Sequence, residues 1–173
     1  GIPRTSHFDW GPVDAEDDAM ADYRTASWAC EFVEKPPAEP FFLAVGLYRP
    51  HLPWYVPQKY FDRYPLDEIT LPEVPDDDLD DVPPAGRRMA KPEGDHRKMV
   101  ESDNWRKAVQ GYLASITFAD EQVGRVIDAL ERSGQAENTI IVLWSDHGWH
   151  LAAKMRWRKF ALWEEAARVT FLI

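Results

Sequence analysis

The sequence predicts an α/β protein in which helices alternate with the strands of a mostly parallel sheet. Two continuous apolar runs of strand length carry this prediction, "PFFLAVGLY" at 40–48 and "TIIVLW" at 139–144. Strands of parallel sheets are buried on both faces and read as such runs. Segments with helical spacing precede them at 14–35 and 101–134, and "RVTFLI" at 168–173 predicts a third strand. Ligands of such folds bind beyond the carboxyl ends of strands, so we expect functional residues directly after both runs.

Both predicted helices have recognisable ends. The first carries acidic residues in its opening turn, where they complement the helix dipole, and stops before Pro36. The second begins at "SDNW", residues 102–105, which supplies an N-cap, and ends at Gly134. A short helix is expected within 56–65. Residues 66–91 show no sustained period, and we expect them to form a long surface loop.

Composition limits the classes of protein to which the chain can belong. Its 173 residues and 45% hydrophobic content suit one globular domain. Thirty acidic against twenty basic residues give a net charge of -10, which argues against a general nucleic-acid binder. No apolar run approaches the roughly 18 residues of a membrane span. Cys30 is the sole cysteine, which excludes an internal disulfide and, at helical spacing with apolar neighbours, indicates core packing.

The charge is unevenly distributed along the chain. Residues 73–81, "EVPDDDLDD", are strongly acidic, whereas the end of the chain is basic. The basic residues there are Lys154, Arg156, Arg158, Lys159 and Arg168. A basic cluster on an acidic protein indicates either a site for an anion or a solvated face.

Polar residues suited to catalysis follow both apolar runs. Asp146, His147 and Gly148 come after the second run. A carboxylate suits calcium or magnesium, and an imidazole binds metals or anions. Glycine would permit a turn at positive φ that brings the two side chains together, although a capped turn with a satisfied histidine explains the pair equally well. His51 follows the first run between two prolines, and is either a rigidly mounted catalytic group or a packed structural residue.

Three blocks, in this order, resemble the sulfatase family and most of all its iduronate-2-sulfatase-like branch. They are "PFFLAVGLYRPHLPWYVPQKYFDRYP", "YLASITFADEQVGRVIDALERSGQAENTIIVLWSDHGWHL" and "WRKFALWEEAARV". The resemblance implies the alkaline-phosphatase-like α/β fold, a three-layer sandwich around a mostly parallel sheet, of which this chain would be a part. It also implies hydrolysis of a sulfate ester at a divalent cation, usually calcium, with a sulfated small molecule or glycan as substrate.

The resemblance also implies roles for individual residues. A cation and an ammonium would stabilise the charge that develops on the sulfate oxygens, and a histidine would protonate the leaving group. The matching residues are Asp146 and His147 for the metal, His51 and Lys159 for catalysis, and Arg49, Lys154 and Arg158 for substrate binding.

The chain departs from the family pattern at several positions. The family nucleophile is a formylglycine made from a cysteine in a Cys-x-Pro-Ser-Arg type motif, and Cys30 in "ACEFV" does not match it. The paired aspartates that complete the metal site are absent, since Asp17 and Asp18 lie in a helical context. Ala152 and Ala153 stand where relatives typically carry glycine and glutamate. We expect residues 1–173 to be a partial catalytic domain, inactive alone, without the N-terminal strands that carry the nucleophile and without the C-terminal subdomain.

Two alternatives stay open at this point. One is a phosphoesterase relative on the same fold. The other is a non-catalytic protein that binds sulfated glycan through Arg49, Arg156, Arg158 and Lys159. Uncovered sheet edges would favour self-association. The family resemblance implies a secreted, periplasmic or lysosomal location.

Overall fold

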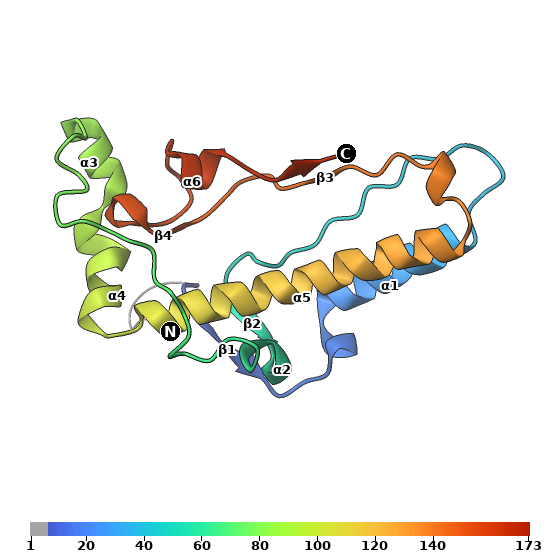
Figure 1. The fold of residues 1–173 in the computed structure, drawn as a ribbon, viewed down its shortest axis with the longest axis horizontal. Helices are drawn as coiled ribbons and strands as arrows, with labels where there is room; N and C mark the ends of the chain where they lie inside the picture. The colour runs from blue at the N-terminus through green and yellow to red at the C-terminus, as the bar shows by residue number, and fades with distance from the viewer. Residues whose placement is uncertain (1–6) are drawn as a thin grey trace. The chain divides into compact units, whose positions relative to one another are not determined.

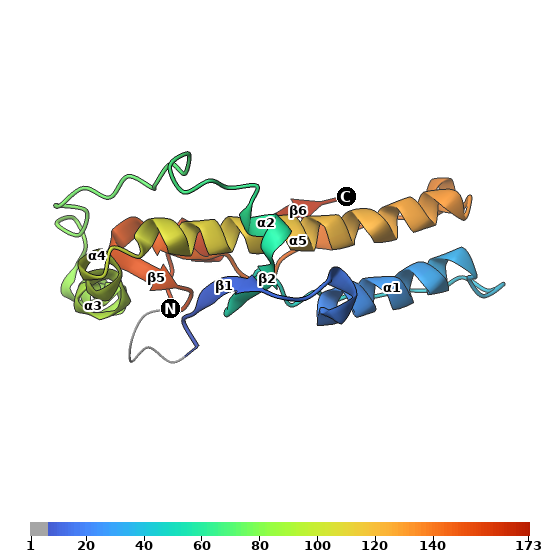
Figure 2. The same cartoon turned by 90° about the horizontal axis from the view of Figure 1, so that it is seen from below.

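A computed structural model describes residues 7–173, which form two compact units. The described part of the first unit comprises 7–68 and 110–140, and that of the second comprises 69–109 and 141–173. Figures 1 and 2 show the ribbon with the element labels used below. No helix among the described residues is long and apolar enough to cross a lipid bilayer.

Two helices make up most of the first unit. α1 (Ala21–Glu34) follows the 3₁₀ helix η1 (Asp17–Ala19), and α5 (Trp105–Arg132) belongs to this unit from residue 110 onward. The two helices lie side by side in both views (Figures 1 and 2). The buried residues of α1 recur every three or four positions, which places them on one face. They are Asp22, Ala26, Ala29 and Val33.

The ends of both helices agree with the sequence prediction. α1 stops at Lys35, directly before two prolines that cannot continue a helix. α5 is 28 residues long and is followed by Gly134, whose φ of +75° is the left-handed conformation of a helix C-cap. The Gly134 N–H donates to the Glu131 carbonyl at 3.0 Å. The short 3₁₀ helix η3 (Ala136–Asn138) comes next.

A parallel strand pair and a short helix pack against α5 in the first unit. β1 (Trp10–Val13) pairs with β2 (Trp54–Pro57), and α2 (Gln58–Phe61) follows within the predicted segment 56–65. One core cluster contains Val56, Tyr60, Phe61, Ala114 and Phe118. A second contains Val33, Ala129 and Leu130, against which half-buried Cys30 packs as predicted.

Gly111 on α5 packs so closely against Trp10 of β1 that a side chain at this position would clash with it. A Cβ there would be 2.8 Å from Trp10 Cβ, and real Cβ atoms do not approach so closely. We expect Gly111→Ala to lower the free energy of unfolding by about 1–2 kcal/mol, because overpacking outweighs the better helix propensity of alanine. Gly124→Ala, on the same helix with open space around it, should instead raise this free energy by about 0.5–1 kcal/mol. Urea unfolding measures the free energy of unfolding of both variants. Equal effects of the two substitutions would contradict the close packing of Gly111 against Trp10.

The second unit contains two short antiparallel strand pairs and several short helices. β4 (His150–Ala152) and β5 (Arg156–Arg158) form a hairpin through the turn η4 (Ala153–Met155). β3 (Leu143–Trp144) pairs with β6 (Phe171–Leu172). The helices are α3 (Pro84–Ala90), the π-helical η2 (Pro92–His96), α4 (Arg97–Glu101) and α6 (Glu164–Ala167).

The prediction of a buried strand at 40–48 is wrong for this chain. No strand forms there, and Phe42 is 90% exposed. Apolar composition is not sufficient for a strand, because the backbone N–H and C=O groups need a neighbouring strand to pair with.

The later predictions hold in part. The run at 139–144 forms a strand only at β3, and both of its residues are exposed rather than buried. The third predicted strand is confirmed at β6, although the pairing is antiparallel. Residues 66–91 are not entirely irregular, because α3 forms where Pro84 suits the first helical position and the good helix formers Arg87, Arg88, Met89 and Ala90 end the segment.

Candidate functional site

Asp146, His147 and Lys159 come together in the second unit. Lys159 Nζ lies 2.7 Å from His147 Nε2, and Asp146 Oδ1 lies 3.9 Å from the same nitrogen. His147 Nδ1 is 2.8 Å from the carbonyl oxygen of Gly148. A carbonyl only accepts, so Nδ1 carries the hydrogen and Nε2 directs its lone pair toward the ammonium of Lys159. The sequence prediction that the Asp-His pair and this lysine share a centre is consistent with this geometry.

The loop after β3 is held by backbone contacts to the end of the chain. The Ser145 N–H donates to the Thr170 carbonyl at 3.3 Å, and the Gly148 N–H donates to the Ala166 carbonyl at 2.9 Å. Ser145 Oγ donates to the carbonyl of His147 at 2.8 Å. These bonds fix the segment that carries Asp146 and His147.

Glycine is required at position 148 for a different reason from the one predicted. The described residues with positive φ do not include Gly148, so no left-handed turn is made there. Instead, a Cβ at this position would be 2.1 Å from the Glu165 carbonyl oxygen and 3.3 Å from that of Arg168. The absence of a side chain lets the backbone around α6 approach the Asp-His segment.

The β4–β5 hairpin carries Lys159 directly after its second strand. Its interior contains His150, whose ring is fully buried and whose Nδ1 lies 3.1 Å from the Ala153 carbonyl. Burial lowers the pKa of His150, which favours the neutral ring. Trp157 is buried in the same hairpin, and Trp105 Nε1 donates to the Leu151 carbonyl at 3.1 Å. This packing fixes the backbone of the hairpin directly before Lys159.

Several basic residues near the end of the chain are paired within the second unit. Arg158 Nε lies 2.7 Å from Asp95 Oδ2. Arg156 donates to the carbonyls of Met89 and Lys159 at 2.8 and 2.9 Å. The basic cluster is therefore not a uniformly solvated face, because intramolecular acceptors hold these side chains.

Lys154 is clamped by the acidic run of residues 73–81. Its Nζ lies 3.0 Å from Asp78 Oδ1 and 3.2 Å from Asp81 Oδ1, and its backbone N–H donates to Asp78 Oδ2 at 2.7 Å. Lys154 has a φ of 55°, an uncommon conformation for a residue with a side chain. Asp78 thus binds both the charge and the backbone of this turn.

Replacing Asp78 should loosen this turn. The hydrogen bond to Asp78 raises the pKa of the Lys154 ammonium, so Asp78→Asn should bring that pKa back toward its ordinary value and speed amide exchange at Lys154. NMR titration of the lysine side-chain signals measures the first effect and hydrogen exchange the second. Asp76→Asn, in the same run but exposed, is the control and should change neither.

Arg49 and His51 lie in the first unit, on the loop between residues 40–48 and β2. His51 Nδ1 lies 2.8 Å from the Leu52 carbonyl, and the His51 and Tyr48 ring centroids are 4.9 Å apart. The Arg49 guanidinium donates to the Tyr55 carbonyl at 3.1 and 3.3 Å. Burial lowers the pKa of Arg49. These two predicted site residues share one loop, and the other five belong to the second unit.

Asp146 and His147 supply only some of the donor atoms that a metal ion needs. Asp146 supplies a carboxylate that is 86% exposed, and His147 supplies Nε2 beside it. Among residues 7–173 no group of three or more His, Cys, Asp or Glu side chains is placed to hold a metal. The pair is thus suited to provide part of a ligand set, since a hard cation needs additional oxygen donors.

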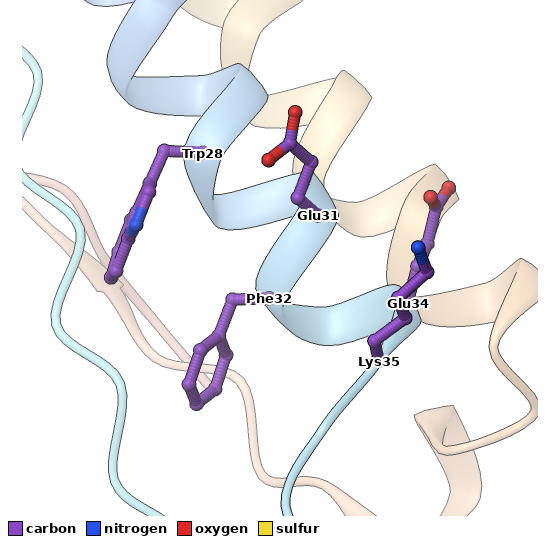
Figure 3. A pocket seen from close by; sticks show the side chains of 5 residues that line it. All are labelled: Trp28, Glu31, Phe32, Glu34 and Lys35. Carbon is purple, nitrogen blue, oxygen red and sulfur yellow. The ribbon is translucent and has the colours of Figure 1, made fainter.

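A separate hollow of about 570 Å³ lies on α1 (Figure 3). Its lining residues are Trp28, Glu31, Phe32, Glu34 and Lys35. The ring of Trp28 stacks on that of Phe32 with centroids 5.9 Å apart. None of the predicted site residues lines this hollow.

The sequence model of the family described as Sulfatase matches residues 5–173. The chain belongs to the sulfatase family. A sulfatase from Formosa agariphila is 46% identical over 169 residues, and iduronate 2-sulfatase from Homo sapiens is 34% identical over 180 residues. The alignments cover 94% and 92% of this chain but only 32% and 31% of those proteins. The chain therefore spans about a third of the length of these sulfatases.

A solved structure gives the fold class. The phosphonate monoester hydrolase from Silicibacter pomeroyi aligns with a TM-score of 0.73 and 24% identity, covering 93% of this chain and 34% of that one. This likeness confirms the predicted α/β fold. Sulfatases of this family generally use a metal ion and a formylglycine.

Several residues that shape the site have no signal in the sequence. Asp78 lies in the predicted surface loop 66–91 and Asp95 in the stretch after it, for which no element was predicted, yet they bind Lys154 and Arg158. Asp22 is buried on α1 and contacts the loop of Arg49. Contacts between residues so far apart in sequence leave no local period or motif, so composition and spacing could not reveal them.

Proposed function

We propose that this chain is part of a sulfuric ester hydrolase that works at a divalent-cation site. The convergence of Asp146, His147 and Lys159 carries the proposal, because it assembles an oxygen ligand, a nitrogen ligand and an ammonium in one place. Membership of the sulfatase family supports it. The same chemistry is expected for any enzyme that must neutralise the charge on a reacting sulfate group.

We propose that Asp146 and His147 hold calcium as two of about six to eight ligands. The bond from His147 Nδ1 to the Gly148 carbonyl leaves Nε2 as the ring nitrogen with a lone pair, and Nε2 would coordinate the ion once the Lys159 ammonium has moved off it. When bound, the ion would supply positive charge to the nonbridging sulfate oxygens. Asp146, which is 86% exposed, keeps both carboxylate oxygens within reach of solvent and ions.

Lys159 and His51 are the proposed catalytic side chains. The Lys159 ammonium would donate to a sulfate oxygen and stabilise the charge that grows there in the transition state. In His51, Nδ1 donates to the Leu52 carbonyl, so Nε2 is the ring atom that changes protonation state. This nitrogen would give a proton to the departing oxygen as general acid.

Arg49, Lys154 and Arg158 are the proposed substrate-binding residues. The Tyr55 carbonyl, Asp78 and Asp95 restrain their side chains. Restraint before binding reduces the entropy lost when a ligand is held.

We further propose that residues 1–173 are a partial catalytic domain, completed by segments outside this chain. Those segments would carry the N-terminal strands with a formylglycine nucleophile, and a C-terminal subdomain. The span of about a third of the sulfatase relatives supports this proposal. In the complete domain, the apolar residues at 40–48 and 139–144 would gain the strand partners that a sheet requires.

The identity of 34% to human iduronate 2-sulfatase supports a sulfated sugar, free or within a glycan, as the substrate class. We also propose that the protein works outside the cytosol, as a secreted, periplasmic or lysosomal enzyme. The net charge of -10 argues against nucleic acid as a general partner.

A sulfate-release assay tests the proposed function. The full-length protein should hydrolyse a chromogenic aryl sulfate, and removal of divalent cations with a chelator should abolish the turnover until calcium is restored. Absence of turnover by metal-loaded, fully folded protein would contradict the proposal.

A second candidate is hydrolysis of a phosphate or phosphonate monoester. The fold likeness to a phosphonate monoester hydrolase favours it, because the same fold supports that reaction there.

A further inference from the structure

Asp22 of α1 binds the loop that carries Arg49 and His51. Its carboxylate is buried, at 6% exposure. Oδ1 accepts the backbone N–H of Tyr48 at 2.9 Å, and Oδ2 accepts that of Arg49, also at 2.9 Å. The two N–H groups are consecutive in the chain, so the carboxylate binds the backbone at the residues where the loop begins.

Hydrogen bonds within residues 48–54 hold the rest of the loop together. The His51 N–H donates to the Tyr48 carbonyl at 2.9 Å, and the Tyr48 hydroxyl donates to the Leu52 carbonyl at 2.7 Å. Trp54 Nε1 donates to the Pro50 carbonyl at 2.8 Å. All of these bonds lie within residues 48–54, whereas Asp22 belongs to a different element and ties the loop to helix α1.

Carboxylate chemistry makes Asp22 specific for this task. A carboxylate has two acceptor oxygens and no hydrogen, so it can take one N–H on each side. An asparagine of the same shape would turn its amide NH₂ toward one of the two backbone N–H groups. That group would then be left without an acceptor in a buried place, which costs free energy.

We infer that Asp22 is a positioning residue that sets the Arg49–His51 loop by accepting the backbone N–H groups of Tyr48 and Arg49. Its consequence for catalysis rests on the proposed function, whereas its effect on the loop does not. Arg49 and His51 touch the substrate in that proposal, and Asp22 acts through them.

The test compares Asp22→Asn with two controls on α1 in the full-length protein. Val33→Ala removes buried side-chain volume from the same helix without touching the loop, and Glu31→Gln changes an exposed carboxylate. Hydrogen exchange at Tyr48 and Arg49 should be faster in Asp22→Asn and unchanged in both controls. For sulfate release, kcat per folded molecule should fall by about 100-fold in Asp22→Asn, because small displacements of catalytic groups are costly.

The outcomes separate this inference from the proposed function. Faster exchange at the two amides beyond that of Val33→Ala supports the anchor, and unchanged exchange overturns it. If the wild-type protein releases no sulfate, the proposed function fails, and the exchange data still decide the role of Asp22. If exchange rises while kcat and the pH profile stay as in wild type, the loop does not position catalytic groups, and the inference is overturned.

Discussion

Replacing Lys159 by methionine is expected to lower kcat for sulfate release by about 100- to 1,000-fold. The ammonium lies 2.7 Å from His147 Nε2, beside the proposed metal ligands, where the charge of a bound sulfate would develop. Methionine keeps much of the side-chain length and loses the charge and all three donors. Steady-state kinetics of the full-length protein with an aryl sulfate measures the effect.

Lys107→Met is the matched control for this prediction. Lys107 is an exposed lysine on α5, and its replacement should leave kcat within about twofold of wild type, as expected of a surface charge. Thermal unfolding of both variants establishes that they are folded. Wild-type kcat in Lys159→Met would remove Lys159 from the catalytic machinery.

Gly148→Ala is expected to destabilise the second unit by about 3 kcal/mol, at the upper end for overpacking. The added Cβ would lie 2.1 Å from the Glu165 carbonyl oxygen, a backbone atom that cannot turn aside as a flexible side chain can. Either the Asp146–His147 segment or the backbone of α6 must move. Because the Gly148 N–H also donates to Ala166, the displacement should break the bond that holds this segment.

Chemical denaturation and hydrogen exchange check the Gly148 prediction. The control is Gly124→Ala on α5, where nothing lies within 4 Å of the added Cβ. We expect Gly124→Ala to change the free energy of unfolding by no more than about 1 kcal/mol. Similar effects of the two substitutions would show that the close approach at Gly148 is not a constraint.

The sequence predicted the helices better than the strands, for a physical reason. α1 and α5 satisfy their backbone hydrogen bonds internally, so their apolar spacing and end signals are readable in the sequence. A strand depends on a partner distant in the chain. The apolar run 40–48 is as hydrophobic as a buried strand, yet among the described residues it forms none, and Phe42 remains exposed.

The candidate site was also predictable in part. The sequence indicated Asp146, His147 and Lys159 as residues of one site. In the structure, Asp146 Oδ1 and Lys159 Nζ both lie within 4 Å of His147 Nε2. The reason for Gly148 was wrong, because the sequence cannot distinguish a glycine needed for positive φ from one needed for close approach. Asp22 and Asp78 act through contacts that span the chain and read as ordinary acidic residues of a helix and a loop.

The cluster of Asp146, His147 and Lys159 is proposed to serve sulfate ester hydrolysis. The decisive measurement compares kcat/KM of the full-length, calcium-loaded protein for an aryl sulfate and for an aryl phosphonate monoester with the same leaving group. We expect kcat/KM to be higher for the sulfate and to fall for that substrate in Lys159→Met. A higher kcat/KM for the phosphonate, or sulfate turnover that is indifferent to Lys159→Met, would contradict it.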